Sequence, residues 1–174
     1  MIALSGIPAL RTERLTLRAP QGDDWPAWRA FYLSDRAVFV RPPDQPPTEE
    51  AAWRSLGHFI GHWPMRGYGS YVIQRHDDPT PLGAVGPWYP AGKPEREIGW
   101  TLWSAEAEGR GYATEAARAT VAHAFETLGW DTAVSYIHAE NRASARVAER
   151  LGATLDPDAG RPDPDDRVYR HPAP

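Results

Sequence analysis

The segment EGRGYATEAARA, residues 108–119, constrains the fold more than any other part of the chain. Gly109 and Gly111 flank Arg110, and the segment continues into a run of helix-forming residues. Residues 96–103, REIGWTLW, precede it and read as a strand. A glycine turn between a strand and a helix leaves backbone N–H groups unpaired at the positive end of a helix dipole. Unless the glycines serve the turn alone, the segment predicts an anion site that suits a phosphate.

Two common phosphate-binding motifs fit this turn poorly. No Gly-Lys-Ser/Thr sequence follows it, which excludes a P-loop. The dinucleotide-binding fingerprint matches at Gly109 and Gly111, but Thr114 stands where the third glycine or alanine belongs. Asp131 lies near the acidic position of that fingerprint. A nucleotide-binding protein therefore remains an alternative interpretation.

The order of the remaining elements predicts a mixed α/β fold. Residues 14–19 alternate between apolar and polar side chains, as a half-buried strand does. Residues 68–74 and 82–89 read as an antiparallel hairpin around the turn signal DDPTP at 77–81. Further strands are expected at 132–139 and 166–171, with a proline-rich loop at 156–164. We therefore expect a mostly antiparallel sheet of six or seven strands flanked by about four helices.

Four helices are expected from their periodicity and their caps. The first spans 22–34, with Asp23 or Asp24 as its cap and Pro26 in its first turn. The second follows the structure-breaking segment 41–47 and starts at Thr48. Its predicted buried face consists of Trp53, Leu56, Phe59, Ile60 and Trp63. The third spans 112–128 and ends at Gly129, and the fourth spans 141–153, with Asn141 as its cap and Gly152 at its end.

Composition narrows the class of protein. A chain of 174 residues suits one domain covering 1–174. Without cysteine it has no disulfide, no thiolate metal site and no cysteine nucleophile, and we expect no metal. A net charge of -4 with dispersed basic residues argues against nucleic-acid and membrane partners. The N-terminal segment has too short an apolar stretch for a signal peptide, so a cytoplasmic protein is expected.

The segment 97–130, followed by AVSYIHAENRASARVAERLGA at 133–153, resembles the GNAT superfamily of acyl-CoA-dependent N-acyltransferases. Within this superfamily, the chain is similar to the RimJ/RimL-type branch of ribosomal-protein N-terminal acetyltransferases. The segment LRTERLTLRAP at 10–20 also resembles the N-terminal strand of that branch. The turn of the family reads [Q/R]-x-x-G-x-[G/A]. Glu108 replaces the leading Gln or Arg, while Gly111 and Ala113 match.

This resemblance implies acetyl-CoA as co-substrate and assigns residues to it. The backbone of the turn would bind the coenzyme A pyrophosphate, and the end of the preceding strand would pair with the pantetheine. The turn residues are Gly109, Arg110, Gly111, Tyr112, Ala113 and Thr114, and the strand residues are Thr101, Leu102 and Trp103. Asn141 would contact the coenzyme as well as cap its helix.

Glu97 is the candidate general base. Attack on a thioester needs a neutral amine, hence a base, and donors for the oxyanion that forms. Strand alternation places Glu97, Gly99, Thr101 and Trp103 on one face, and the small residues leave space beside the carboxylate. The alternative is an ordinary surface glutamate beside Arg96.

The acid for the departing thiolate is less evident. Many GNAT enzymes carry a tyrosine seven residues after the asparagine, but Ala148 stands there. Ser144 matches the serine of the RimJ/RimL-type pattern and is the candidate acid, unless it is only a polar residue of the first helical turn. Water can also supply the proton.

The remaining candidate residues are histidines and aromatic residues. His138 is interpreted as a hydrogen-bonded core residue that also serves as a reserve base, and His123 as structural or solvated. An acceptor cleft could be lined by aromatic side chains, although most aromatic residues belong to cores. Its candidates are Phe31, Tyr32, Trp88 and Tyr89.

The sequence thus predicts an N-acetyltransferase that moves an acetyl group from acetyl-CoA directly to a primary amine in a ternary complex. The acceptor is expected to be a small molecule or a peptide amine. A non-catalytic acyl-CoA-binding module is the main alternative, because the tyrosine acid is missing and Glu108 departs from the family pattern. A homodimer is compatible with the sequence but not required by it.

Overall fold

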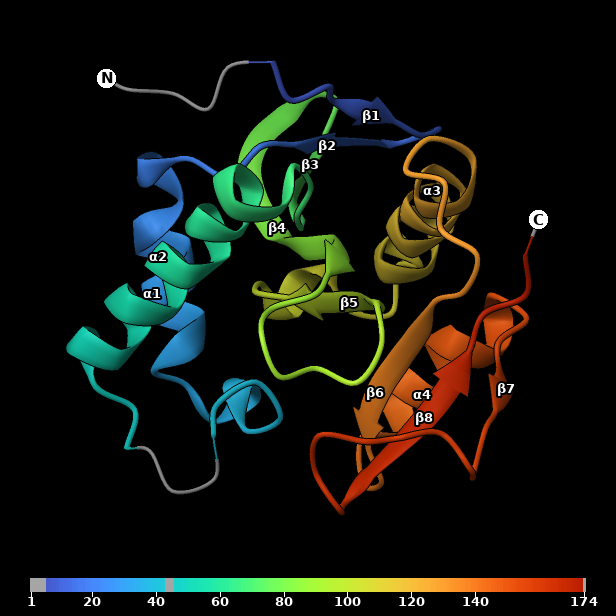
Figure 1. Cartoon of the computed structure of the whole chain (residues 1–174). Helices are drawn as coiled ribbons and strands as arrows, with labels where there is room; N and C mark the ends of the chain where they lie inside the picture. Colours follow the sequence, from blue (N-terminus) through green and yellow to red (C-terminus); the bar gives the residue numbers. More distant parts are fainter. Residues whose placement is uncertain (1–5, 43–45, 174) are drawn as a thin grey trace.

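One mixed sheet organises the chain in the computed structural model, which describes residues 6–42 and 46–173 (Figure 1). Its strand order is β1-β2-β3-β4-β5-β6-β8-β7. The strands are β1 (Leu10–Arg11), β2 (Leu15–Arg18), β3 (Tyr71–Arg75), β4 (Asp78–Trp88), β5 (Glu97–Leu102), β6 (Val134–His138), β7 (Thr154–Leu155) and β8 (Asp166–Arg170). All neighbours pair antiparallel except β5 and β6, which are parallel. The mostly antiparallel sheet is confirmed, and it has eight strands because β1 and β7, of two residues each, join its edges.

Four α-helices accompany the sheet, as the sequence predicts. They are α1 (Trp25–Tyr32), α2 (Glu49–Arg66), α3 (Tyr112–Glu126) and α4 (Arg142–Arg150). The Thr48 hydroxyl accepts a hydrogen bond from the Ala51 N–H and caps α2 as expected. No helix among the described residues is long and apolar enough to cross a membrane.

The helices form two layers on opposite faces of the sheet (Figure 1). On one face, α1 and α2 pack their aromatic side chains against Val72, Ala84 and Trp103. On the other face, α3 packs against Ile98 and Trp100, with further contacts from α4. Successive residues of β5 therefore point alternately into the two layers.

Two local predictions are wrong, and a third is described only in part. The hairpin turn is formed by residues 76–77, and the expected turn at 77–81 lies mostly within β4, because Arg75 already pairs with Asp78. Asp24 does not cap α1 through its side chain, because its carboxylate is buried and pairs with Arg18 at 2.6 Å. Part of the predicted break at 41–47 lies outside the described residues.

Trp53 also departs from its predicted place. It is 62% exposed and contacts Trp25 edge-on, with ring centroids 5.1 Å apart. The buried stripe of α2 runs through Ala52, Leu56 and Trp63. Since each helical residue advances by about 100°, Trp53 lies at the edge of the stripe that starts at Ala52.

A buried histidine, His171, takes part in the contacts that join β5 and β6, the parallel pair of the sheet. The Ser135 hydroxyl donates to the Ile98 carbonyl at 2.6 Å, so it accepts from His171 Nε2 at 2.9 Å. His171 also donates its backbone N–H to Ala133 O. Burial lowers the pKa of His171 to about 4, which keeps the ring neutral at neutral pH.

This histidine predicts a pH-dependent stability. Its pKa is lower in the folded chain than the ordinary value near 6.5, so the unfolded chain binds more protons between about pH 4 and 6.5. The free energy of unfolding should lose up to about 3 kcal/mol from this group as the pH falls through that range. The His171→Gln variant keeps an N–H donor but does not titrate, so it should lack this component in urea unfolding at pH 7 and pH 5. Equal pH dependence in both proteins would contradict the assignment.

Candidate active site

The turn before α3 exposes its backbone as the sequence predicts. Gly109 and Gly111 have φ angles of 71° and 80°, in the left-handed region that favours glycine. Gly111 is the N-cap of α3, and the Glu115 N–H is the first to bond within the helix, to Gly111 O at 3.0 Å. The N–H groups of residues 112–114 therefore have no acceptor inside the helix. Together with the helix dipole they form a binding site for an anion.

Arg14, the residue before β2, contacts this turn and the first turn of α3. Its guanidinium lies 2.7 Å from Glu115 Oε2 and donates to Arg110 O at 3.1 Å. Thr12 also donates to the Glu115 carboxylate. Burial by itself raises the pKa of Glu115, but the hydrogen bonds from Thr12 and Arg14 outweigh it and lower the pKa below its ordinary value. The carboxylate in the first turn is thus neutralised by partners about 100 residues away in the sequence, and motif analysis alone does not find them.

Glu108 has a structural partner at the surface. Its carboxylate pairs with Arg36 in the 3₁₀ turn η2 (Asp35–Ala37). Arg36 also donates to the carbonyl oxygens of Leu102, at 3.1 Å, and Trp103, at 2.6 Å. Arg36 therefore links η2, the end of β5 and the turn before α3. The departure from the family pattern at position 108 is explained by this ion pair.

Strands β5 and β6 separate almost at once, which exposes backbone on β5. They share one registered pair, Glu97 with Val134, and then diverge (Figure 1). The Trp103 N–H donates to Leu82 O at 2.7 Å, so by alternation Trp100 and Leu102 direct their backbone groups toward β6. Of the three residues predicted to pair with pantetheine, Leu102 lies on the open edge. The prediction is wrong for Thr101 and Trp103, because their backbone groups face β4, which already accepts the Trp103 N–H.

Glu97 shares a sheet face with the residues the sequence predicts for it. Since Glu97 and Val134 are registered in parallel strands, Gly99, Thr101, Tyr136 and His138 occupy the same face. This is the face covered by α1 and α2, to which Trp103 belongs. A Cβ at Gly99 would lie 3.6 Å from Glu97 Oε1, its nearest neighbour. Glycine therefore leaves room beside the carboxylate, as predicted.

The Glu97 carboxylate is largely buried and faces a cation. Its side chain is 13% exposed, and Oε2 lies 2.9 Å from Lys93 Nζ. Burial raises the pKa of Glu97 above its ordinary value, although Lys93 opposes this, and nearby Asp166 raises it further. A carboxylate with a raised pKa accepts a proton more readily than an exposed glutamate does.

His138 and Asp166 continue the same face at the end of β6. They are registered partners across β6 and β8, and burial raises the pKa of Asp166. His138 Nδ1 accepts the Glu140 N–H at 3.2 Å, and its ring packs against exposed Phe39. The predicted hydrogen bond is confirmed, but the ring is half-buried at a strand end rather than in the core.

The other predicted residues separate into core and loop positions. Phe31 and Tyr32 are buried in the core around Trp28, which contradicts their assignment to an acceptor cleft, because α1 turns that face toward the sheet. Trp88 stacks on His62 with ring centroids 4.3 Å apart. His123 is half-buried beside Tyr71, as a structural histidine is expected to be.

His62 holds the β4–β5 loop, residues 89–96, in place. Its Nδ1 donates to Tyr68 O at 2.8 Å and its Nε2 accepts the Tyr89 N–H at 3.0 Å, so the ring is neutral. Burial lowers the pKa of His62. Sequence analysis missed this residue, because only the fold brings α2 to the loop. His62 thus fixes the position of Tyr89, where the loop that carries Lys93 begins.

On α4, Asn141 and Ser144 form the predicted cap. Asn141 Oδ1 accepts the Ser144 N–H at 3.1 Å. The Ser144 side chain is half-buried and Ala148 is fully buried. A tyrosine at position 148 would have to fit where Ala148 packs against Ile137 and Tyr169.

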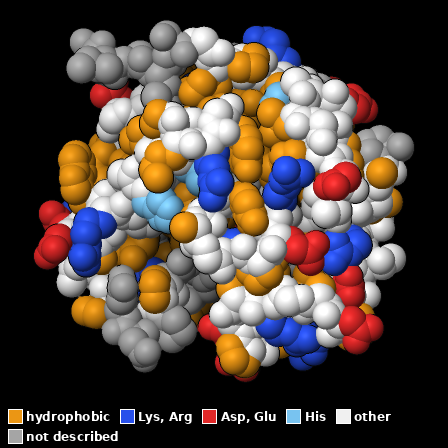
Figure 2. All heavy atoms as spheres, viewed as in Figure 1, with side chains coloured by type: hydrophobic (Ala, Val, Ile, Leu, Met, Phe, Trp, Pro, Cys, Tyr) orange, Lys and Arg blue, Asp and Glu red, His pale blue; other side chains and the backbone are white. Residues whose placement is uncertain are grey.

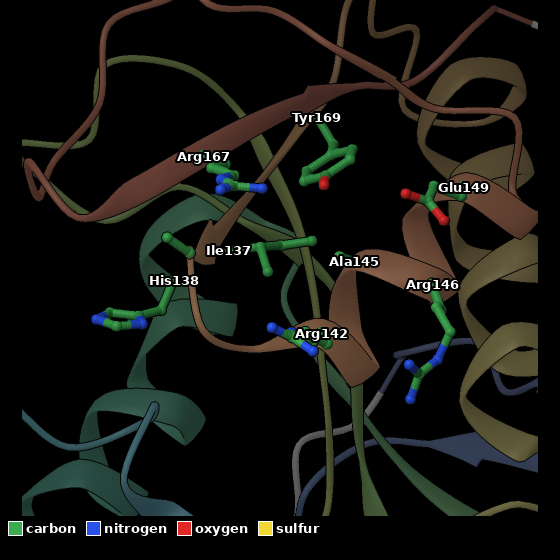
Figure 3. Close-up of a pocket in the computed structure, with 9 residues that line it drawn as sticks. Ile137, His138, Arg142, Ala145, Arg146, Glu149, Arg167 and Tyr169 are labelled. Atoms are coloured by element: carbon green, nitrogen blue, oxygen red, sulfur yellow. The ribbon is translucent and has the colours of Figure 1, made fainter.

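Two cavities lie on the α3 and α4 side of the sheet. One, of about 650 Å³, borders the start of α3 and is lined in part by Gly111, Thr114, Arg118 and Arg150. The other, of about 330 Å³, lies between α4 and β8. Figure 3 shows Arg142 and Arg167 on facing sides of this second cavity, and His138 pointing away from it. Neither cavity is lined by Glu97, which lies on the opposite face.

The face that carries Glu97 offers a mixed surface. In the view of Figure 2, hydrophobic side chains are exposed among histidine and basic side chains across the middle of the surface. Val38, Phe39 and Val40 after η2 contribute exposed apolar area.

Comparisons with known proteins agree with this geometry. Residues 14–154 match the family model described as acetyltransferase (GNAT) domain. The chain is 44% identical to an acetyltransferase of Agrobacterium tumefaciens, with a TM-score of 0.87 over 99% of this chain and 98% of that one. It is 27% identical to the uncharacterized N-acetyltransferase YnaD of Bacillus subtilis, over 82% of this chain and 81% of that protein. RimL, a ribosomal L7/L12 alpha-N-protein acetyltransferase solved with coenzyme A, shares the fold at 21% identity, with a TM-score of 0.72 over 94% and 97%.

The chain therefore belongs to the GNAT acetyltransferase family and is an N-acetyltransferase. Enzymes of this family use acetyl-CoA, and the structural neighbours include RimL-type proteins. Neither the non-catalytic module nor the nucleotide-binding protein is favoured by this membership.

Replacement of Gly111 tests the anion site. Gly111→Val should strain the turn and obstruct close approach to the N–H groups of residues 112–114. The loss of one or two charge-assisted hydrogen bonds should weaken acetyl-CoA binding about 10- to 100-fold in calorimetric titration. Gly129→Val is a matched control, because Gly129 has a φ of 66° beyond the other end of α3. Similar affinity losses in both variants would show that strain, and not the turn, determines binding.

Proposed function

We propose that the chain acts as one domain that transfers an acetyl group from acetyl-CoA to a primary amine by direct attack in a ternary complex. The observation that carries the proposal is the buried Glu97 carboxylate, on the first residue of the strand that separates from β6. Membership of the GNAT family supports acetyl transfer as the reaction. The carboxylate would accept a proton from the amine on the sheet face covered by α1 and α2. The coenzyme would bind from the side of α3.

Coenzyme binding is assigned to the backbone of two elements. The pyrophosphate would accept hydrogen bonds from the N–H groups at the start of α3, with Arg110 beside it. The pantetheine would pair with the backbone N–H of Leu102, because the Leu102 carbonyl already accepts from Arg36. Asn141 would contact the coenzyme from the start of α4. Support for this arrangement comes from the positive φ angles at the turn and from the separation of β5 and β6.

The chemistry follows from the charges on the β5 face. Glu97, directly or through a water, would take a proton from the acceptor ammonium, and the neutral amine would attack the thioester carbonyl. A free N–H on the β5 edge would stabilise the oxyanion, an interaction that contributes about 3 to 4 kcal/mol where it has been measured. Ser144 or water would protonate the thiolate.

The acceptor is proposed to be a primary amine on a small molecule or a peptide. Likeness to RimL, which is named for a protein N-terminus, supports a peptide among the acceptors to be tested. A panel of amines, including peptides with free N-termini, should identify substrates by the release of free coenzyme A. Stabilisation by acetyl-CoA but not by NAD or ATP in thermal unfolding would support the proposal. A chain stabilised only by NAD or ATP would refute it.

Replacement of Glu97 tests the base. Glu97→Gln keeps size and hydrogen bonding but accepts no proton, so turnover below neutral pH should fall by about 10² to 10⁴. Because the pKa of Glu97 is raised, wild-type activity should fall with decreasing pH above the range of an ordinary glutamate. The variant should lack this limb and recover in part at alkaline pH, where more amine is neutral.

Glu95→Gln is a matched control for this test. Glu95 lies two residues earlier and pairs with Arg170 at 2.8 Å, so its loss should affect stability but not the pH profile. Full activity of Glu97→Gln across the pH range would remove Glu97 and make His138 the next residue to test. A uniform loss at every pH would indicate that Glu97 binds the ammonium without taking its proton.

Replacement of Ser144 tests the acid. Ser144→Ala should lower turnover modestly, because water can compete as a proton donor, and should leave coenzyme binding nearly unchanged. The Ser144 N–H, which the cap uses, is retained in the variant. Unchanged turnover, with the chemical step shown to be rate-limiting, would leave Ser144 as a residue of the helical turn only.

A further inference from the structure

The only lysine of the chain lies beside the candidate base. Lys93 is in the loop 89–96, and its Nζ is 2.9 Å from Glu97 Oε2. Every other basic side chain apart from the histidines is an arginine, whose guanidinium stays charged and is not an acyl acceptor. Lys93 is therefore the only side-chain primary amine that acetyl transfer within this chain can reach.

The surroundings of Lys93 hold its side chain beside the candidate base. Its Nζ lies 4.6 Å from the centroid of the Tyr136 ring, in cation–π geometry. Asp166 also acts electrostatically on Glu97, and His138 is the registered partner of Asp166. The lysine side chain is 22% exposed, so it is held in the site rather than extended into solvent.

We propose that Lys93 is a self-acetylation site, at which the chain transfers the acetyl group of bound acetyl-CoA to its own Nζ. The proposal rests on the proposed function, because it uses the same carboxylate and the same co-substrate. The geometry that carries it is the contact between Nζ and Glu97, which gives this lysine the proton acceptor that an external amine requires.

The step balances without any further reactant. Glu97 takes one proton from the Lys93 ammonium, and the nitrogen lone pair attacks the thioester carbonyl carbon. A C–N bond forms, the C–S bond breaks, and the sulfur leaves with its electron pair as the coenzyme A thiolate. The thiolate takes the second proton lost from nitrogen, and Glu97 returns its proton to water. The products are acetyl-lysine and free coenzyme A.

Burial of the carboxylate favours this transfer. Burial raises the pKa of Glu97, which makes the carboxylate a better proton acceptor than an exposed glutamate. By contrast, an ordinary exposed lysine near pH 7.4 is neutral in only about one molecule in a thousand. The contact between Lys93 and Glu97 places an acceptor beside the proton that must leave the nitrogen before it can attack.

Mass spectrometry of the purified full chain incubated with acetyl-CoA tests the proposal. We expect one acetyl group on the peptide that contains Lys93, separated by peptide mapping from any acetyl group on the N-terminal amine. The first-order rate should not depend on protein concentration, because donor and acceptor belong to one molecule. Glu97→Gln should slow the modification by about 10²-fold or more, and Lys93→Arg should abolish it.

A second lysine provides the matched control. Arg54→Lys introduces an amine four residues after Glu50 on α2, where the native side chain is 68% exposed and lies beside a carboxylate at 3.9 Å. The amine at position 54 should be acetylated only at the spontaneous rate, at least about 10²-fold more slowly than Lys93. Thermal unfolding of each variant establishes that it is folded, and titration with acetyl-CoA establishes that it binds the co-substrate.

The outcomes separate this proposal from the proposed function. If the enzyme acetylates external amines while Lys93 remains unmodified over many turnovers, self-acetylation is refuted and the function stands. Equal rates at positions 93 and 54, or no effect of Glu97→Gln, would show spontaneous acetylation only and would also refute it. A rate that rises with protein concentration would refute transfer within one molecule. A chain that binds no acetyl-CoA would refute both.

Discussion

The separation of β5 from β6 after the single pair of Glu97 and Val134 is the constraint on which the rest of the structure depends. Beyond that pair, side-chain bonds from Ser135 and His171 replace the backbone ladder and hold the strands at the point where they part. An open strand edge with unpaired backbone groups is costly unless a ligand or water satisfies them. Because the separation begins at Glu97, the residue proposed as base and the strand edge proposed to bind the coenzyme both depend on one irregularity in the sheet.

Two glutamates illustrate how environment assigns different roles to the same side chain. Glu115 receives hydrogen bonds from Thr12 and Arg14 that lower its pKa, so it is a permanent anion that braces the turn. Glu97 has one cation, Lys93, and burial raises its pKa. A carboxylate that stays charged suits a structural ion pair, whereas one whose charge is less stable suits proton transfer.

Most of the fold was predictable because its signals are local. Strand alternation, the cap at Thr48 and the glycines of the α3 turn lie within a few residues of the structure they specify. The errors occur where a contact made in the folded chain overrides a local preference. Asp24 pairs with Arg18 instead of capping α1, and the Trp103 N–H is used by Leu82 of β4.

By itself the sequence determined the order of elements, the turn at Gly109–Gly111 with its unpaired backbone N–H groups, and the face of β5 that carries Glu97. Each of these depends on local backbone conformation and on the periodicity of the residues. Tertiary structure alone decided what surrounds them. Arg14 reaches Glu115 and Arg36 reaches Glu108 across 101 and 72 residues, respectively. Such contacts depend on how strands and helices pack in space, and no spacing in the sequence encodes that packing. The burial that raises the pKa of Glu97 is likewise a property of the packed layers.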